Sequence, residues 1–331
     1  MAHSPSGVHR IDLVIYPGFK ALEAVGPMSV FDYANVHLRQ KGLPEGYALR
    51  VVAASQGLVR SDTLMALEAT HTLADVEQDT GGTVLLVGAR HIATVLQASS
   101  PLVEWLQRVA PRVQRMVTLC SGSFFLAAAG LLDGRRAATH WSVAQELQRR
   151  HPAVRVDADA IYVRDGHYWT SAGVTAGIDL ALAVVEQDFG HALALEVARD
   201  LVMYLKRPGG QSQFSVQLAS QSVQHSGVRL VQQWVLEHLD APMSPAVLAH
   251  KAALSERHFR RIFLQETGLT PSAFIERARL EGAKQLLEVR GDLPLKTVAG
   301  KVGLGSEQAL RHLFQRRLGI TPVAYRERFG D

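Results

Sequence analysis

The chain has 331 residues, of which 47% are hydrophobic, and its 35 basic and 31 acidic side chains give a formal net charge of +4. This length predicts about two domains, each able to fold without disulfides or structural metal. The composition excludes wholesale disorder, the longest apolar run is too short to cross a membrane, and one cysteine cannot build a disulfide or a Cys-rich metal site. The N-terminus has no hydrophobic signal core, so we expect a cytoplasmic protein.

Up to residue 205, short apolar runs alternate with longer amphipathic segments. The predicted buried strands are Ile11–Tyr16, Leu49–Ala54, Thr83–Val87 and Met116–Leu119. The predicted helices are Gly26–Gln40, Ile92–Ala98, Ser142–Arg150, Ile178–Phe189 and Ala192–Leu205. Asp165–Gly166 is typical of a two-residue hairpin turn between Ala160–Arg164 and His167–Ser171. The alternation predicts an α/β domain, residues 1–205, with helices on both faces of a parallel sheet.

A predicted linker, residues 206–227, begins with KRPGGQSQFS and separates two regions of opposite charge. The net charge is −3 over residues 1–205 and +7 over residues 206–331. A basic segment behind an acidic one indicates that only the predicted C-terminal domain, residues 228–331, binds a polyanion. A solvated, arginine-rich helical face would give the same imbalance.

The C-terminal domain shows only helical patterns and contains an internal repeat. The predicted helices are Val228–Leu239, Ser244–Lys251, Glu256–Glu266, Pro271–Glu288, Leu295–Val302 and Ser306–Arg317. Residues 255–274 (SERHFRRIFLQETGLTPSAF) and residues 306–325 (SEQALRHLFQRRLGITPVAY) align at an offset of 51 residues, with eight of 20 positions identical. Chance would give about one or two identities, so one supersecondary unit is duplicated.

Each repeat has the layout of a helix-turn-helix. A short helix and a tight turn precede Ser255 or Ser306, which suits a helix N-cap, and the second helix ends at Gly268 or Gly319. In such motifs the second helix enters the major groove of DNA. Pro271–Glu288 would hold two such helices about one DNA turn, roughly 34 Å, apart. The predicted DNA-contacting residues are Arg257, Arg260, Arg261, Ser306, Glu307, Gln308, Arg311 and His312.

The single cysteine, Cys120, lies between a predicted strand and the helical run Phe124–Leu132. A nucleophile between a strand and a helix start forms an elbow, and a helix N-terminus is expected to lower the pKa of its thiol. A buried small residue at a tight turn fits the same pattern. The candidate pocket comprises Cys120, Ser121, Glu23 in the loop after the first strand, His140 and Trp141. The histidines lack ligand spacing, so we predict neither a metal site nor a cofactor.

Both halves of the chain resemble known families. ALEAVGPMSVF (21–31), LCSGSFFLAAAGLLDGRRAATHW (119–141) and SAGVTAGIDLAL (171–182) resemble the class I glutamine amidotransferase-like superfamily, in the branch of PfpI-type proteases and isocyanide hydratases. Residues 228–329, and above all TPVAYRERF, resemble an AraC/XylS-type DNA-binding domain. Leu304 and His312 depart from that family, which commonly has Phe at the first position and often Arg or Lys at the second. The fusion of the two resembles GlxA-type transcriptional regulators.

The resemblance implies a flavodoxin-like sandwich, with the acidic Glu23 beside the sulfur of Cys120, followed by an all-α domain with two helix-turn-helix units. It implies a sequence-specific regulator of transcription, an activator, which binds double-stranded DNA. The first domain is expected to form a homodimer and to bind a small, often nitrogenous inducer. Hydrolytic relatives carry His where this chain has Ser121, which favours binding over catalysis. The alternative is a Cys-dependent hydratase or hydrolase with an appended DNA-binding module, since isocyanide hydratases carry a hydroxyl residue there.

Overall fold

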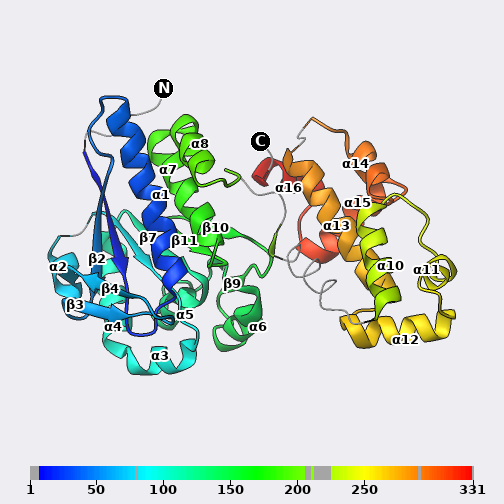
Figure 1. The fold of residues 1–331 in the computed structure, drawn as a ribbon, viewed down its shortest axis with the longest axis horizontal. Helices are drawn as coiled ribbons and strands as arrows, with labels where there is room; N and C mark the ends of the chain where they lie inside the picture. The colour runs from blue at the N-terminus through cyan, green and yellow to red at the C-terminus, as the bar shows by residue number, and fades with distance from the viewer. Residues whose placement is uncertain (1–6, 80, 206–209, 212–224, 290–291, 330–331) are drawn as a thin grey trace. The chain divides into compact units, whose positions relative to one another are not determined.

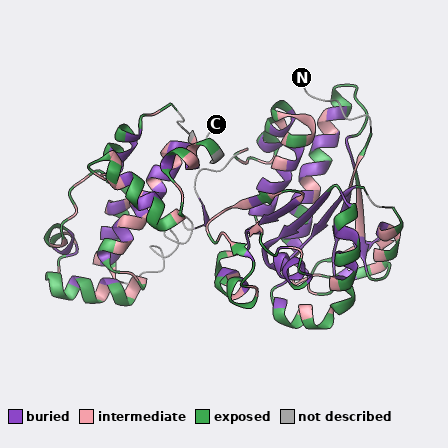
Figure 2. Ribbon diagram, turned by 180° about the vertical axis from the view of Figure 1, so that it is seen from behind, coloured by how far each residue is buried: buried purple, intermediate pink, exposed green. Residues whose placement is uncertain are grey.

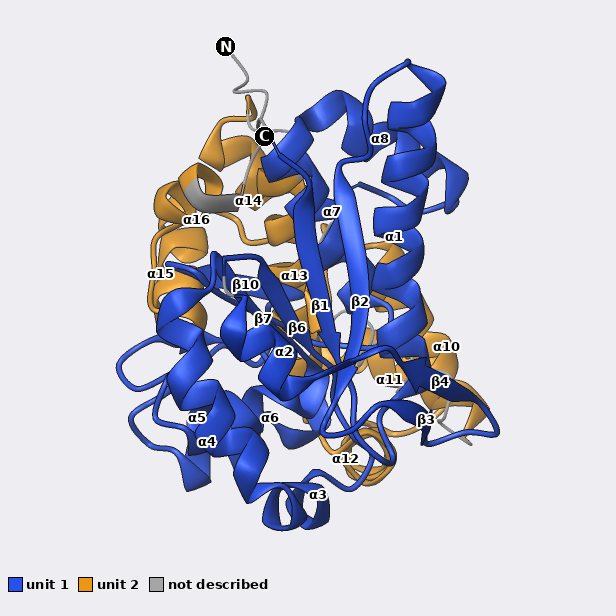
Figure 3. Cartoon of the chain, turned by 90° about the vertical axis from the view of Figure 1, so that its left-hand side faces the viewer, with its two compact units in different colours: residues 1–207 blue, residues 208–331 orange. Residues whose placement is uncertain are grey.

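The computed structural model describes residues 7–79, 81–205, 210–211, 225–289 and 292–329. The chain divides into two compact units, residues 1–207 and 208–331, which are coloured separately in Figure 3. Each unit is described by itself. Most of the predicted linker, residues 206–227, lies outside the described residues.

The first unit contains a seven-stranded sheet, in which six neighbouring strands run parallel. In spatial order the strands are β10 (Tyr162–Asp165), β11 (Tyr168–Ser171), β7 (Arg115–Leu119), β6 (Thr83–Leu86), β1 (His9–Val14), β2 (Tyr47–Ala53) and β5 (His71–Thr72). Only β10 is antiparallel, since the hairpin at Asp165–Gly166 joins it to β11. The four predicted parallel strands and the hairpin are therefore confirmed.

Helices cover both faces of this sheet, which confirms the predicted α/β sandwich. Figure 3 shows α1 (Ala21–Gln40), α7 (Ala176–Phe189) and α8 (His191–Asp200) on one face, and α2 (Leu73–Gln78), α4 (Ser100–Val109) and α5 (Ser123–Ala128) on the other. The central strands β1, β6, β7 and β11 are buried along most of their length (Figure 2) because helices exclude water from both sides. Among the described residues this unit also contains the α-helices α3 (Ile92–Ala98) and α6 (Trp141–Arg150).

The sequence analysis missed several short elements. These are the edge strand β5, the hairpin β3 (Gly57–Arg60) and β4 (Ala66–Ala69), the pair β8 (Arg136–Ala137) and β9 (Arg155–Val156), and the helices α2 and α4. The loop between β3 and β4 reaches the carboxyl edge of the sheet, where the backbone N–H of Asp62 donates to the carbonyl of Phe19 over 2.8 Å.

Three predicted helix bounds in this unit are wrong, one of them the end of the run Phe124–Leu132, whose helix α5 ends at Ala128. Helix α1 begins at Ala21, five residues before the predicted start at Gly26, although Pro27 lies inside it. Gly26 and Pro27 usually disfavour a helix interior, but here Gly26 allows close packing of α1 on α7. A Cβ atom at Gly26 would come within 2.9 Å of Ile178. Helix α8 ends at Asp200 rather than Leu205, because Val202 adopts a left-handed backbone with φ 54°.

Helices are the only regular elements in the described residues of the second unit, and each helix predicted for it is confirmed within a few residues. They are α10 (Ser226–Glu237), α11 (Pro245–Lys251), α12 (Glu256–Thr267), α13 (Pro271–Val289), α14 (Leu295–Lys301) and α15 (Glu307–Leu318), followed by α16 (Pro322–Phe329), which was not predicted. Helix α13 contributes Phe274 and Ala278 to a core with α10–α12, and Ala283 and Leu287 to a second core with α14–α16. One long helix thus joins two helix-turn-helix units (Figure 1).

The turns of the two helix-turn-helix units differ by one residue. In each, a left-handed residue follows the first helix: Ala253 with φ 55° and Gly303 with φ 69°. The next residue donates back to the helix, Leu254 to the carbonyl of Ala249 and Leu304 to that of Ala299. The second turn then adds Gly305 before its N-cap serine. The repeat offset is therefore 50 residues for the first helices and 51 for the second.

The end of α15 is tied to α13 by an ion-pair cluster. The guanidinium groups of Arg316 and Arg317 each reach the carboxylate of Glu276, with N–O distances of 2.5 Å. Because Glu276 lies in the part of α13 that supports the first helix-turn-helix, this cluster fixes the second recognition helix to the helix shared by both units.

Candidate functional sites

Cys120 lies at the carboxyl edge of the sheet, in the predicted elbow. It follows β7 directly, opens the 3-10 turn Cys120–Gly122 before α5, and adopts φ 53°. Gly173, in the loop after β11, lies against it so closely that a Cβ atom there would be 2.0 Å from the Cβ of Cys120. The thiol is almost completely buried. The structure therefore has the predicted strand–turn–helix elbow at Cys120, but its thiol is shielded from solvent; we call this the closed elbow.

Glu23 and Lys20 approach this thiol from the start of α1. The carboxylate of Glu23 is fully buried and accepts hydrogen bonds from the backbone N–H groups of Gly88 (2.8 Å) and Val174 (3.2 Å). Lys20 donates to the Sγ of Cys120 over 2.9 Å and lies 3.5 Å from the nearer oxygen of Glu23. Glu23 is therefore in the first turn of a helix, not in the loop that the sequence analysis expected.

The expectation of an acidified thiol is wrong. Burial, with Glu23 as the next cause, raises the pKa of Cys120 to about 12, and the opposing effect of Lys20 is smaller. On the order of one thiol in 10⁵ is ionised at pH 7 with such a pKa. Sequence reasoning considered the helix start alone and missed Lys20, whose only signal was its position three residues before Glu23.

The other predicted pocket residues divide into a closed part and a more accessible part. Ser121 is buried, and its hydroxyl bonds both the N–H and the carbonyl of Ala89, so it belongs to the closed elbow. His140 caps α6 and accepts from Ser142, and burial together with Lys20 lowers its pKa. Trp141 begins α6 and is 56% exposed. His140 is half-buried and Trp141 is largely exposed, so both are more accessible than the thiol.

Two other expectations bear on ligands and membranes. In the described part of the chain, no three His, Cys, Asp or Glu side chains are grouped so that they could hold a metal ion. No helix within the described ranges is long and apolar enough to span a bilayer.

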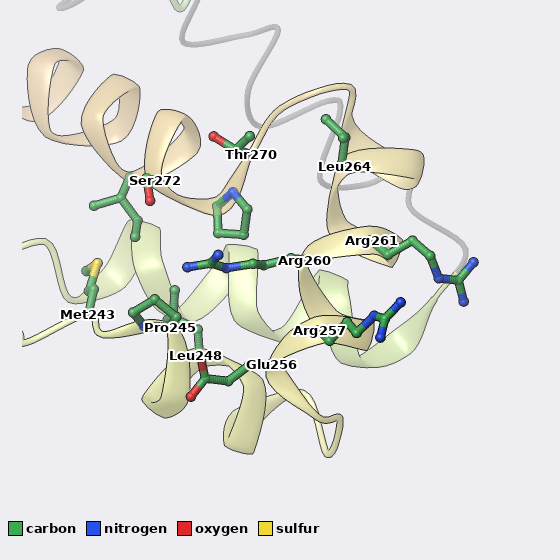
Figure 4. Close-up of a pocket in the computed structure, with 12 residues that line it drawn as sticks. Met243, Pro245, Leu248, Glu256, Arg257, Arg260, Arg261, Leu264, Thr270 and Ser272 are labelled. Atoms are coloured by element: carbon green, nitrogen blue, oxygen red, sulfur yellow. The ribbon is translucent and has the colours of Figure 1, made fainter.

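The first predicted recognition helix, α12, exposes its arginines and buries its aromatic side. Ser255 caps it, with its hydroxyl accepting from the N–H of His258, while Phe259 and Phe263 enter the core. Arg257, Arg260 and Arg261 are all exposed. All three arginines line a groove of about 790 Å³, and Figure 4 shows Arg260 extended across it. The groove is bordered by α11, α12 and the start of α13, with Leu248 and Ile275 among its apolar residues.

The second predicted recognition helix, α15, repeats this design with different contacts. Ser306 accepts from the N–H of Ala309, and Leu310, Leu313 and Phe314 are buried. Gln308, Arg311 and His312 are exposed. Glu307 is partly exposed and binds Arg311, at 2.6 Å from Nη2 and 3.0 Å from Nε.

Comparison with known proteins identifies both units. Residues 9–187 match the DJ-1/PfpI family, and residues 248–328 match a helix-turn-helix domain. Over 93% of this chain and 89% of its relative, the sequence is 30% identical to the HTH-type transcriptional regulator CdhR of Pseudomonas aeruginosa. It is 27% identical to the HTH-type transcriptional regulator GlxA of Rhizobium meliloti, over 68% of this chain and 69% of GlxA. The isonitrile hydratase of Pseudomonas putida is 29% identical over 55% of this chain and 72% of that enzyme.

Two exposed recognition helices behind an α/β domain of this kind define a DNA-binding transcriptional regulator. The chain belongs to the DJ-1/PfpI family, in the form in which that domain precedes an AraC-type helix-turn-helix domain. The resemblance to GlxA-type regulators is confirmed.

Proposed function

We propose that this regulator contacts DNA through α12 and α15 and that a small ligand, bound at the carboxyl edge of the first unit, sets its activity. The observation that supports DNA contact most strongly is the duplicated helix-turn-helix with exposed guanidinium, amide and imidazole groups on equivalent helix faces. These side chains donate to guanine edges, adenine edges and phosphates. The proposed contact residues are Arg257, Arg260, Arg261, Ser306, Glu307, Gln308, Arg311 and His312.

DNA binding by the full chain across a salt series tests this proposal. We expect a sequence-selective complex whose logarithmic affinity falls linearly with the logarithm of salt concentration, by about 0.9 for each phosphate contact. The triple variant Arg257→Ala, Arg260→Ala, Arg261→Ala should weaken the complex and flatten the slope. Replacement of the exposed Arg149 and Arg150 of α6 by Ala removes charge from the other unit and should change neither. A wild-type complex without salt dependence would contradict the proposal.

The ligand site that we propose is the rim formed by Lys20, His140 and Trp141 above the closed elbow. The side chain of Lys20 is 22% accessible and has three donors, of which Cys120 and Glu23 engage two. A carboxylate or carbonyl oxygen of a small metabolite, nitrogenous as the family resemblance implied, would accept from it. We propose that the exposed Trp141 ring, whose centroid lies 5.4 Å from that of His140, offers an apolar surface to the same ligand.

Thermal shift measurements with a panel of small amino and quaternary-ammonium carboxylates test the rim. A ligand that binds only the folded state raises the melting temperature with concentration. We expect the shift to disappear in Lys20→Met and to persist in Lys41→Met, which changes an exposed lysine at the far end of α1. Equal shifts in both variants would place the ligand elsewhere.

We further propose that the first unit forms a homodimer and that the regulator is an activator. Leu22, Val25 and Tyr33 lie on one side of α1 at helical spacing and remain 48%, 36% and 37% exposed, which supports an apolar interface there. Light scattering should give twice the chain mass, and Leu22→Glu should shift it to the monomer. A promoter reporter that rises when the regulator and its ligand are supplied would support activation, and a falling signal would indicate repression.

A Cys-dependent hydratase or hydrolase is the second candidate. The similarity to isonitrile hydratase and the contacts among Cys120, Lys20 and Glu23 favour it. The raised pKa of Cys120 opposes it, and we propose that the chain is not an enzyme. Iodoacetamide at pH 7 should label Cys120 far more slowly than free cysteine. Isonitrile turnover that is lost in Cys120→Ala would instead establish the enzyme.

A further inference from the structure

The two recognition helices keep only a few residues in common, and most of these have a structural reason. The N-cap serines and C-cap glycines shape the helix ends, and Phe263 and Phe314 fill the two cores. Two shared residues remain on the outside of the helices. They are the pairs Glu256 and Glu307, in the first position, and Arg260 and Arg311, one turn later.

Helix formation explains the glutamates better than the arginines. A carboxylate in the first turn stabilises any helix through its dipole. The pair Glu307–Arg311 adds a surface ion pair, which contributes only about 0.3–0.5 kcal/mol. The first helix-turn-helix does not form the corresponding ion pair. Among the described residues neither Glu256 nor Arg260 has an ion-pair or side-chain hydrogen-bond partner. Arg260 extends into the open groove instead (Figure 4). Its identity with Arg311 therefore has no explanation within the fold.

The neighbouring outward positions differ between the two units. Arg257 corresponds to Gln308, and Arg261 corresponds to His312. These pairs differ in which base edges they match, since Arg suits guanine and Gln suits adenine. The arginine at Arg260 and Arg311 is therefore identical in the two helices, whereas the outward residues before and after it differ.

We infer that Arg260 and Arg311 read the same base, a guanine, at equivalent positions of two successive DNA sites, and that the neighbouring residues make the two sites different. Arg bonds guanine O6 and N7 with two parallel donors, and the glutamate one turn earlier accepts from the Arg or from the N4 of a cytosine. Helix α13, whose 19 residues span about 28 Å, joins the two helix-turn-helix units, and we infer that it holds α12 and α15 in successive major grooves, about one DNA turn apart. The operator would then carry two G·C pairs about 10–11 base pairs apart, within unlike flanking sequences. This inference rests on the proposed DNA contacts of α12 and α15.

Selection from a randomised duplex pool with the full chain, followed by single base-pair substitutions in the selected site, tests the inference. Arg260→Ala should abolish discrimination at one G·C pair and Arg311→Ala at another, each by about 10- to 100-fold. Arg229→Ala, at an exposed arginine of α10 outside both motifs, is the matched control and should leave the base preferences unchanged. Circular dichroism and melting curves of the variants establish that the fold is intact.

Three results would overturn the inference in different ways. A uniform loss of affinity for all sequences, with a salt slope lower by about 1 for each variant, would make both arginines phosphate contacts. Relaxation at base pairs that are not both G·C would show that the two units read different bases. Failure of the wild-type chain to select any sequence would contradict the proposed function itself. The wild-type selection is carried out before the variants are measured, so this failure is distinguished from a failure of the inference.

Discussion

The elbow of the first unit and the recognition helices of the second use charged side chains in opposite ways. Glu23 is fully buried, and two backbone N–H groups and Lys20 satisfy its carboxylate. Arg257 and Arg260 are exposed and have no side-chain partner among the described residues. A buried charge must be satisfied by the protein itself, whereas an exposed one is available to a ligand of opposite charge. Substitutions at the elbow should therefore cost stability, and substitutions on the helices should cost DNA affinity.

The largest effect is expected from Gly173→Ala. Its new Cβ would lie 2.0 Å from the Cβ of Cys120 and 2.6 Å from its Cα, at a backbone φ of 78° that disfavours any side chain. Relief requires movement of the backbone, so we expect a loss above about 5 kcal/mol, enough to prevent folding of the first unit. Circular dichroism and yield of soluble protein measure it.

Gly42→Ala separates the clash from backbone strain alone. Gly42 has a similar φ of 70°, but no atom lies within 4 Å of the position of its added Cβ. A loss of about 1 kcal/mol is expected there. If Gly173→Ala were no worse than this control, the closed elbow would not exist in solution.

The second effect is a pH dependence carried by Cys120. Its pKa is about 12 when folded and 9.0 when free, so below pH 9 the thiol is protonated in both states. Above pH 9 the unfolded chain loses this proton first, and the free energy of unfolding falls by about 1.4 kcal/mol per pH unit until about pH 12. Denaturant unfolding at pH 8–11 should show a steeper decline for the wild type than for Cys120→Ala. Parallel declines would show that the thiol is solvated.

The third effect concerns the helices, where we expect affinity and stability to separate. Arg257→Ala should weaken the DNA complex by about 1–3 kcal/mol, as loss of a base-edge or phosphate contact does. The free energy of unfolding should change by less than about 0.5 kcal/mol, because the side chain is exposed and unpaired within the described residues. Fluorescence anisotropy and urea unfolding measure the two. A variant that lost both DNA affinity and stability would show that exposed charges on the helices also stabilise the fold, as the buried charges at the elbow do.

The smallest effect is a gain of stability in the turn of the first helix-turn-helix. Ala253 adopts φ 55°, in the left-handed region. The equivalent residue of the second helix-turn-helix is Gly303, with φ 69°. Ala253→Gly relieves the strain of a Cβ atom in that region, so we expect about 0.5–1 kcal/mol of stabilisation in thermal unfolding. The reverse change, Gly303→Ala, would bring a Cβ atom within 2.3 Å of the carbonyl oxygen of Leu239 and should destabilise strongly.

Local patterns in the sequence were enough to predict most of the fold. The buried strands are short runs of Val, Ile and Leu, and the recognition helices are bounded by capping residues, Ser255 and Gly268 in one case and Ser306 and Gly319 in the other. Both signals act within a few residues and need no knowledge of tertiary contacts. The repeat also required only the sequence, because its equivalent positions are aligned by a constant offset.

The contacts at the elbow could not be predicted in the same way. Lys20 reaches Cys120 across 100 positions in the chain, and Glu23 accepts from Val174 across 151. The pKa of the thiol depends on burial by several strands and helices at once, which no local pattern records. Likewise, Gly26 and Pro27 indicate a helix break locally, and only packing on α7 shows that α1 continues through them.

The additional glycine in the second turn, Gly305, limits which segments of the two helix-turn-helix units can be exchanged. Because the helices before the turn are offset by 50 residues and those after it by 51, a segment copied from one helix-turn-helix to the other must include either the whole turn or none of it. A graft that begins after the N-cap serine leaves each turn in its own context, so α15 side chains can replace those of α12 without a change of register. Regulators with two copies of one reading helix, or with the order of the two reversed, could be built in this way.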